Sequence, residues 1–229
     1  MPSRGSLPAG NLWIAKELFD LGGVQFGDFS LGRTTRHSPV YVNPRVLISR
    51  PSVLQRVARI MADDVKAKQL MARPECAEFQ LVAGVPVGGL HLATALSLHA
   101  QVPMIYVRPD HPKNGTSRIE GLFQPGQRVL VVDDLMTTGG SLLETAQALE
   151  AAGLEVRNAL VLVDRDQGGI ERLKLHGYGV LRLLSLKVML NFYMAEGLIT
   201  EEQYRNSLDY IQTHRADAAA EQRPGDSRA

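Results

Sequence analysis

The stretch VLVVDDLMTTGGS, residues 129–141, decides the fold expected for this chain. Its first four residues are aliphatic, which predicts a short strand that is buried on both faces. Two carboxylates, Asp133 and Asp134, stand where that strand is expected to end. A turn of small residues follows, and Ser141 is expected to open a helix because Ser141 and Glu144 have the spacing of a capping box. The stretch therefore predicts a strand, a tight turn and a helix in succession.

The residue types in this turn favour a phosphate as its ligand. Glycines allow the backbone to approach a ligand closely, and a helix N-terminus offers free N–H groups and a partial positive charge. The two carboxylates would repel a phosphate at the same point, so they are expected to face sugar hydroxyls or a magnesium ion. A phosphorylated ribose satisfies both requirements. The alternative is a purely structural turn with solvated acids. The turn has neither the Gly-Lys-Ser/Thr of a Walker A loop nor the G-x-G-x-x-G dinucleotide fingerprint.

This segment resembles the phosphoribosyl pyrophosphate (PRPP) motif of type I phosphoribosyltransferases. Further segments of the chain are similar to those of orotate phosphoribosyltransferase, and they come in that family's order. They are FGDFSL (26–31), SPVYVNPRVLISRP (38–51), GVPVGG (84–89), NGTSRIEG (114–121) and VLVDRDQGG (161–169). The resemblance extends over roughly residues 11 to 195, and the DRDQGG and SPVYVN segments make it specific to the orotate enzymes.

The composition is that of an ordinary globular enzyme. The chain has 229 residues, 45% of them hydrophobic and 21% charged, with a formal net charge of +1. This charge gives no reason to expect nucleic acid as a partner. The single cysteine, Cys76, excludes an intrachain disulfide and suits a reducing compartment. There is no apolar run of transmembrane length and no signal-peptide core, so we expect a cytoplasmic protein without a membrane partner.

The order of elements predicts an α/β fold with a doubly wound, mainly parallel sheet, because strand-like segments alternate with helix-length segments. We expect one domain over residues 11–215, preceded by a loose N-terminus at 1–10 and followed by a disordered tail at 216–229. Within it, residues of about 11–50 and the C-terminal helices are expected to form a small hood.

Ligands of open α/β sheets bind beyond the carboxyl ends of the strands. In this chain those ends are expected to carry residues 84–89, Arg108, residues 133–141 and Arg165. These segments should therefore converge on one edge of the sheet. A long polar loop, residues 108–121, follows one of the strands and is too irregular to be assigned to a helix or a strand.

The resemblance implies transfer of the 5-phosphoribosyl group from PRPP to orotate, which gives orotidine 5′-phosphate and pyrophosphate in pyrimidine synthesis. Magnesium is implied as the cofactor, bound through PRPP without a metal site of the protein itself. The resemblance assigns catalysis to Asp133, Asp134 and Lys113. It assigns PRPP binding to Arg108, Lys113, Asp133, Asp134, Leu135, Met136, Thr137, Thr138, Gly139, Gly140 and Ser141. It assigns orotate binding to Thr137, Arg165, Tyr41 and Val42.

The chain departs from the family pattern in two places. The lysine expected before Ser38 is missing, which leaves open whether Arg33, Arg36 or no residue replaces it. In the loop, both usual lysine positions are prolines, Pro109 and Pro112, and Lys113 is shifted by one residue. An intact phosphate turn beside an altered loop leaves two alternatives open. One is an enzyme for another base, and the other is a PRPP-binding sensor with reduced or no catalysis. The resemblance also implies a homodimer with shared active sites.

Overall fold

The computed structural model describes residues 10–31, 35–109 and 118–221. Its centre is a six-stranded sheet with the strand order β5-β4-β3-β6-β7-β8. The strands are β3 (Leu81–Gly84), β4 (Met104–Val107), β5 (Ile119–Glu120), β6 (Arg128–Met136), β7 (Glu155–Asp164) and β8 (Gly179–Ser185). All neighbours in this sheet pair in parallel except β4 and β5, which are antiparallel.

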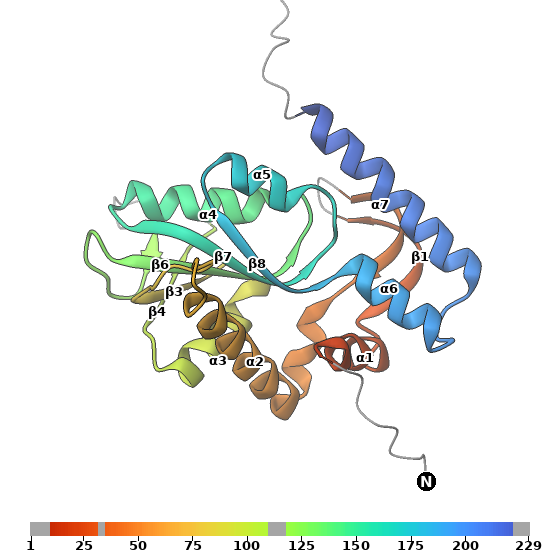
Figure 1. Cartoon of the computed structure of the whole chain (residues 1–229), viewed down its shortest axis with the longest axis horizontal. Helices are drawn as coiled ribbons and strands as arrows, with labels where there is room; N and C mark the ends of the chain where they lie inside the picture. Colours follow the sequence, from red (N-terminus) through yellow and green to blue (C-terminus); the bar gives the residue numbers. More distant parts are fainter. Residues whose placement is uncertain (1–9, 32–34, 110–117, 222–229) are drawn as a thin grey trace, which may run out of the picture.

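Helices cover both faces of the sheet, as Figure 1 shows. They are α2 (Pro51–Gln69), α3 (Gly88–Ala100), α4 (Gly140–Ala151) and α5 (Gly169–Leu175). Successive strand residues point to opposite faces, so Val82 joins the core beneath α2 and α3, whereas Leu81 and Ala83 join the core beneath α4 and α5. The fold is the predicted doubly wound α/β sheet.

A smaller unit lies beside the carboxyl ends of the strands and forms the hood. It consists of α1 (Leu12–Asp20), the antiparallel hairpin β1 (Val24–Leu31) and β2 (Thr35–Val42), and the 3-10 helix η1 (Pro44–Ser49). Two C-terminal helices, α6 (Leu186–Ala195) and α7 (Glu201–Glu221), pack against it (Figure 1). The Tyr193 hydroxyl of α6 donates a hydrogen bond to the Ala15 carbonyl at 2.8 Å, which ties the two ends of the chain together.

Two helices begin with side-chain caps that their sequences encode. The Ser185 hydroxyl accepts a hydrogen bond from the Val188 amide at 3.3 Å at the start of α6. Thr200 and Gln203 exchange two hydrogen bonds, of 2.9 and 3.1 Å, immediately before α7 and in its first turn. This reciprocal pair is a capping box, and it fixes where the last helix starts.

Three sequence-based boundaries differ from the structure. Strand β6 does not end before the acids: it continues to Met136 because the chain from Asp133 to Met136 keeps pairing with β7. The loop at 108–121 contains the short strand β5, which pairs with the end of β4. Helix α7 reaches Glu221, six residues past the boundary that we set at residue 215. Its last turns have the sequence ADAAAE, and alanine has the highest helix propensity of all residues.

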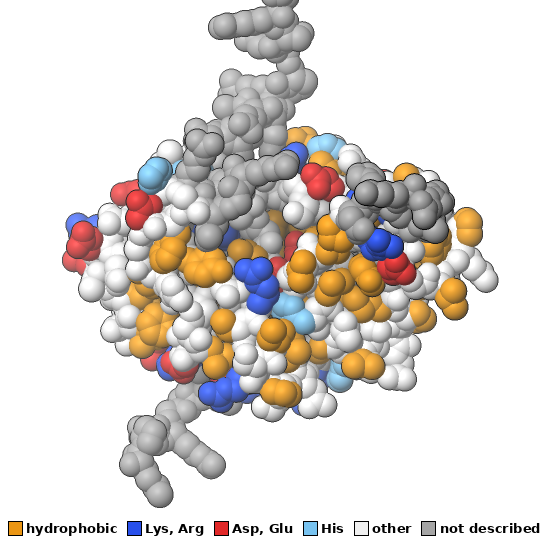
Figure 2. Space-filling view, turned by 180° about the vertical axis from the view of Figure 1, so that it is seen from behind, with side chains coloured by type: hydrophobic (Ala, Val, Ile, Leu, Met, Phe, Trp, Pro, Cys, Tyr) orange, Lys and Arg blue, Asp and Glu red, His pale blue; other side chains and the backbone are white. Residues whose placement is uncertain are grey.

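Charged side chains of both signs are dispersed over the face shown in Figure 2, and no large patch of one sign forms there. Within the described residues, no helix is both long and apolar enough to cross a bilayer.

Candidate active site

Strand β6 brings two buried carboxylates to the carboxyl edge of the sheet. Asp133 is 6% exposed and Asp134 is 8% exposed. The Asp133 carboxylate accepts a hydrogen bond from the Asp134 amide at 2.8 Å. Burial, and then the neighbouring Asp134 carboxylate, raise the pKa of Asp133 well above its usual value. Neither acid forms an ion pair within the described residues. Two buried, unpaired acids are costly for folding, which indicates that they serve a ligand.

The turn after β6 leads directly into α4. Gly139 has a φ of +77° and is the N-cap residue, and the helix starts at Gly140. The predicted capping box is wrong: Ser141 lies inside the first turn, and no side chain caps the helix. The left-handed glycine already turns the chain into the helix, so a serine cap is not needed. The first backbone N–H groups of α4 therefore remain available to an anion.

A second turn, GVPVGG at residues 84–89, packs onto the two acids. A Cβ atom on Gly88 would lie 2.2 Å from an oxygen of the Asp134 carboxylate. A Cβ atom on Gly89 would lie 2.3 Å from the Val132 carbonyl oxygen. Only glycine fits at these two positions, since any side chain would displace the carboxylates or their strand. The Pro86–Val87 peptide bond in this turn is cis.

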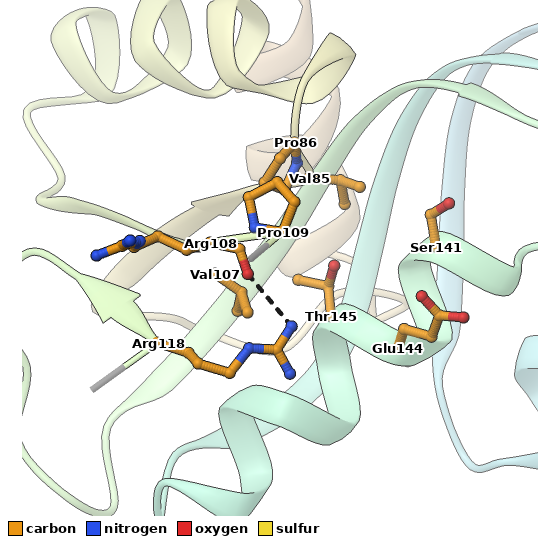
Figure 3. Close-up of a pocket in the computed structure, with 9 residues that line it drawn as sticks. All are labelled: Val85, Pro86, Val107, Arg108, Pro109, Arg118, Ser141, Glu144 and Thr145. Atoms are coloured by element: carbon orange, nitrogen blue, oxygen red, sulfur yellow. Dashed lines mark hydrogen bonds between the residues drawn. The ribbon is translucent and has the colours of Figure 1, made fainter. Parts of the chain in front are cut away.

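Two neighbouring cavities open at this edge. The first is lined by Val42, Pro44, Arg45, Val85, Pro86, Val87, Gly88, Asp133, Asp134, Leu135 and Ser141. The second, drawn in Figure 3, is lined by Val85, Pro86, Val107, Arg108, Pro109, Arg118, Ser141, Glu144 and Thr145. Because they share Val85, Pro86 and Ser141, the cavities lie side by side around the start of α4. The predicted segments at 84–89, Arg108 and 133–141 thus meet here, whereas Arg165, the fourth predicted member, lines neither cavity.

The two arginines at the second cavity point in different directions. The Arg108 guanidinium turns away from α4 in Figure 3, and its Nη1 lies 3.3 Å from the Glu120 carboxylate. Arg118 instead extends toward the first turns of α4, near Thr145. Its Nη2 donates to the Arg108 carbonyl at 3.2 Å, and its buried Nε has no hydrogen-bond partner within the described residues. The family resemblance points to Arg108 but not to Arg118, because only the pairing of β4 with β5 brings Arg118 to the cavity.

Arg165 follows β7 and is 2% exposed. Its Nη2 donates to the Ser38 hydroxyl at 2.8 Å and to the Val40 carbonyl at 3.3 Å, both in β2. Its Nε is buried without a partner in the described part of the chain. Burial lowers the pKa of the Arg165 guanidinium. Arg165 therefore joins the sheet to the hood and keeps a donor for a further acceptor.

The turn that carries Arg165 packs against the turn after β6, the segment that resembles the PRPP motif. A Cβ atom on Gly169 would lie 2.7 Å from the Thr137 carbonyl oxygen and 2.8 Å from the Met136 sulfur. On the hood side, Val42 lines the first cavity, and Tyr41 is half-buried with its ring 5.6 Å from that of Phe29.

Some predicted site residues cannot be placed. Lys113 and Arg33 lie outside the described residues, as does the Arg36 side chain. Their assignment to the site rests on the sequence alone.

The comparisons with known proteins agree with this geometry. A family profile described as "Phosphoribosyl transferase domain" matches residues 49–178. Orotate phosphoribosyltransferase of Chlamydia caviae is 35% identical over 80% of this chain and 86% of its own length. The structure of orotate phosphoribosyltransferase from Aeropyrum pernix is 37% identical, covers 78% of this chain and 97% of its own, and has a TM-score of 0.64.

Longer relatives contain the same unit. Uridine 5′-monophosphate synthase of Bos taurus is 34% identical over 92% of this chain, but the match spans only 42% of the bovine protein. The structure of UMP synthase from Leishmania donovani has a TM-score of 0.78 at 32% identity, covering 89% of this chain and 42% of its own. The phosphate turn, the acid pair and these relatives together show that the chain belongs to the orotate phosphoribosyltransferases of the type I phosphoribosyltransferase family.

Proposed function

We propose that the protein transfers the 5-phosphoribosyl group of PRPP to orotate. The bond from C1 of the ribose to the diphosphate breaks, and a bond from C1 to N1 of orotate forms with loss of the N1 proton. The products are orotidine 5′-phosphate and pyrophosphate. The observation that carries this proposal is the first cavity, where Asp133 and Asp134 of β6 and Ser141 of α4 meet Val42 of the hood.

Each part of the cavity suits one part of the reactants. The acids would hold the ribose hydroxyls, and Thr138 to Ser141 would bind the 5-phosphate at the start of α4. Thr137, Arg165, Tyr41 and Val42 would hold the orotate. As the diphosphate departs, C1 becomes positively charged, and two carboxylates beneath the ribose stabilise that charge. Fixing both reactants in line removes much of the entropic barrier.

Arg165 is the residue best suited to recognise the orotate carboxylate. A guanidinium presents its N–H groups in a planar fork that matches a carboxylate. The contacts with Ser38 and Val40 use Nη2, so the buried Nε remains as a donor. A sensor that binds only PRPP would not need this buried arginine. The named orotate phosphoribosyltransferase relatives also favour an enzyme over a sensor.

Magnesium would enter with PRPP. Within the described residues no group of three or more His, Cys, Asp or Glu side chains gathers into a metal site. Asp133 and Asp134 offer carboxylate oxygens, which magnesium prefers, on the side of the cavity where the ribose would lie. When bound, the ion would neutralise charge on the departing pyrophosphate. The buried free thiol of Cys76 supports a reducing compartment such as the cytoplasm.

The reaction is tested by measuring orotidine 5′-phosphate formed from orotate and PRPP with magnesium. Uracil, hypoxanthine and adenine serve as alternative bases. We expect turnover with orotate and at most traces with the others. Product from another base at a higher kcat/KM than orotate would refute the assignment of the base.

We also propose a homodimer in which residues 108–121 of one subunit complete the other subunit's site. Long polar loops of this kind commonly close over active sites. If Lys113 neutralises the pyrophosphate in this way, Lys113→Ala should lower kcat strongly. Mixing it with Asp133→Asn/Asp134→Asn protein should restore some activity, because one heterodimer site would combine two intact parts. Confirmed subunit exchange without any rescue would exclude loop sharing.

A further inference from the structure

Arg45 is the cation that the hood contributes to the acid-lined cavity. It follows β2 in η1, which packs against both α3 and β6. Among the residues that line this cavity, which include Asp133 and Asp134, Arg45 is the one with a positive charge. The sequence analysis singled out Tyr41, Val42 and the arginines before Ser38, but not Arg45.

Neighbouring side chains fix the orientation of Arg45. Its Nε donates to the Asn43 carboxamide oxygen at 2.9 Å, and its Nη2 lies 3.5 Å from the Tyr41 hydroxyl. The Tyr41 ring in turn packs on Phe29 with ring centres 5.6 Å apart. These contacts hold one edge of the guanidinium to the hood, although the residue is exposed. An exposed arginine held in place loses less entropy when it binds an anion.

The pKa of His91 shows that Arg45 and Asp134 act on the same imidazole. Burial lowers the pKa of His91, while Asp134 raises it and Arg45 lowers it further. One imidazole in α3 is therefore within reach of both charges. Arg45 offsets part of the negative potential that the two carboxylates create where the phosphates must enter.

The cavity needs a cation for the diphosphate of PRPP. The turn at residues 85–88 lines it with the sequence Val-Pro-Val-Gly, which carries no charge. With both acids ionised, the lining residues sum to one negative charge, since there are two carboxylates and one guanidinium. Without Arg45 the lining would carry two negative charges, which would disfavour a diphosphate even when magnesium accompanies it.

We propose that Arg45 binds the diphosphate of PRPP and the pyrophosphate product. This inference rests on the proposed reaction and adds to it a cation in a cavity whose turn at 85–88 carries no charge. Diphosphate is favoured over the orotate carboxylate because the buried Arg165 is already proposed for that carboxylate, and Arg45 lines the cavity together with the acids and the uncharged turn at 85–88.

The test compares the full-length wild type with Arg45→Ala, Arg45→Lys and the matched control Arg59→Ala, whose arginine is exposed on α2. Calorimetry gives Kd for PRPP and for magnesium pyrophosphate, and steady-state assays give KM for each substrate. We expect Arg45→Ala to weaken both phosphate ligands about ten- to a hundredfold, which is the range for a charge-assisted hydrogen bond. Arg45→Lys should recover part of this loss. In Arg45→Ala, KM for orotate should stay within about twofold of wild type. In the control Arg59→Ala, every constant should stay within about twofold of wild type.

Two results would overturn the inference. One is an unchanged Kd for both phosphate ligands in a folded Arg45→Ala protein, with folding checked by thermal denaturation. The other is a rise in KM for orotate alone, which would place the arginine on the carboxylate. If the wild type makes no orotidine 5′-phosphate, the proposed reaction fails, but the pyrophosphate titrations still decide the role of Arg45.

Discussion

Two turns at the same edge of the sheet have nearly the same local structure but different surroundings. The turn from β6 to α4 and the turn from β7 to α5 both follow a strand with acids near its carboxyl end. Each places a left-handed glycine at the N-cap, Gly139 with a φ of +77° and Gly168 with a φ of +84°. In each, a second glycine begins the helix. Local backbone geometry therefore does not distinguish them.

The two turns differ in the partners of their acids. Asp164, the last residue of β7, and Asp166 both accept hydrogen bonds from Nη1 of Arg182 on β8, at 2.6 and 2.9 Å. Asp166 also accepts the Lys187 amide at 3.0 Å. Asp133 and Asp134 have no such cation within the described residues. The comparison indicates that paired acids hold a turn in place, and unpaired buried acids are kept for a ligand.

The largest effect should come from the unpaired acids. Asp133→Asn with Asp134→Asn should lower kcat/KM by roughly a thousandfold or more, because the charge that stabilises the transition state is lost. The fold should not suffer. Since burial raises the folded-state pKa of Asp133, ionisation destabilises the native protein as pH rises through that pKa. The variant should therefore match or exceed the wild-type Tm at pH 8.

Assays of kcat/KM and thermal denaturation at pH 5 and pH 8 test both parts. A comparable kcat/KM in the two proteins would remove the catalytic role. A large drop in Tm would place these acids in the same structural class as Asp164 and Asp166.

Arg165 tests whether the second turn also serves a substrate. Arg165→Ala should raise KM for orotate by roughly a hundredfold, as expected for loss of a buried charge-assisted contact, and change KM for PRPP much less. Ser38→Ala is a useful control because it removes the 2.8 Å contact to the hood and keeps the guanidinium. Equal changes in both KM values for Arg165→Ala would show that the arginine only joins the hood to the sheet.

The smallest effect should come from the paired acids. Arg182→Met leaves Asp164, which is 2% exposed, without its cation. Loss of a buried pair is costly, but the Arg182 side chain is 40% exposed, so solvent screening reduces the expected loss of unfolding free energy to about 1–3 kcal/mol. Burial already raises the pKa of Asp164, and the variant should recover stability as pH falls and Asp164 becomes protonated.

Chemical denaturation at pH 5 and pH 8 measures this difference. Arg157→Met is the control, since Arg157 is exposed on β7 and lies 3.8 Å from Glu155. A loss in Arg182→Met no larger than in the control would show that the ion pairs do not hold the second turn.

Local sequence patterns predicted the parts of the site that lie on one segment. The acids, the turn at 137–140 and the sheet edge followed from a buried strand and the glycines after it. The length of β6 did not, because its last four residues stay in the sheet through pairing with β7 rather than through a hydrophobic pattern. Arg118 and Arg182 were missed for a related reason: their contacts depend on which strands become neighbours. Nothing in the spacing of Arg45 relative to Tyr41 shows that η1 places it beside β6.

The hydrogen bond between Tyr193 and Ala15 has a consequence for how this chain is made. The bonded residues are 178 positions apart, and α1 buries Trp13, Ile14 and Leu18 in the core that α6 completes. During synthesis, α1 must therefore wait until α6 has emerged from the ribosome. Until then its apolar side chains are exposed, and such surface promotes aggregation of partly synthesised chains. We expect truncations that end before α6 to be recovered mainly as aggregates, even though every strand of the central sheet is present.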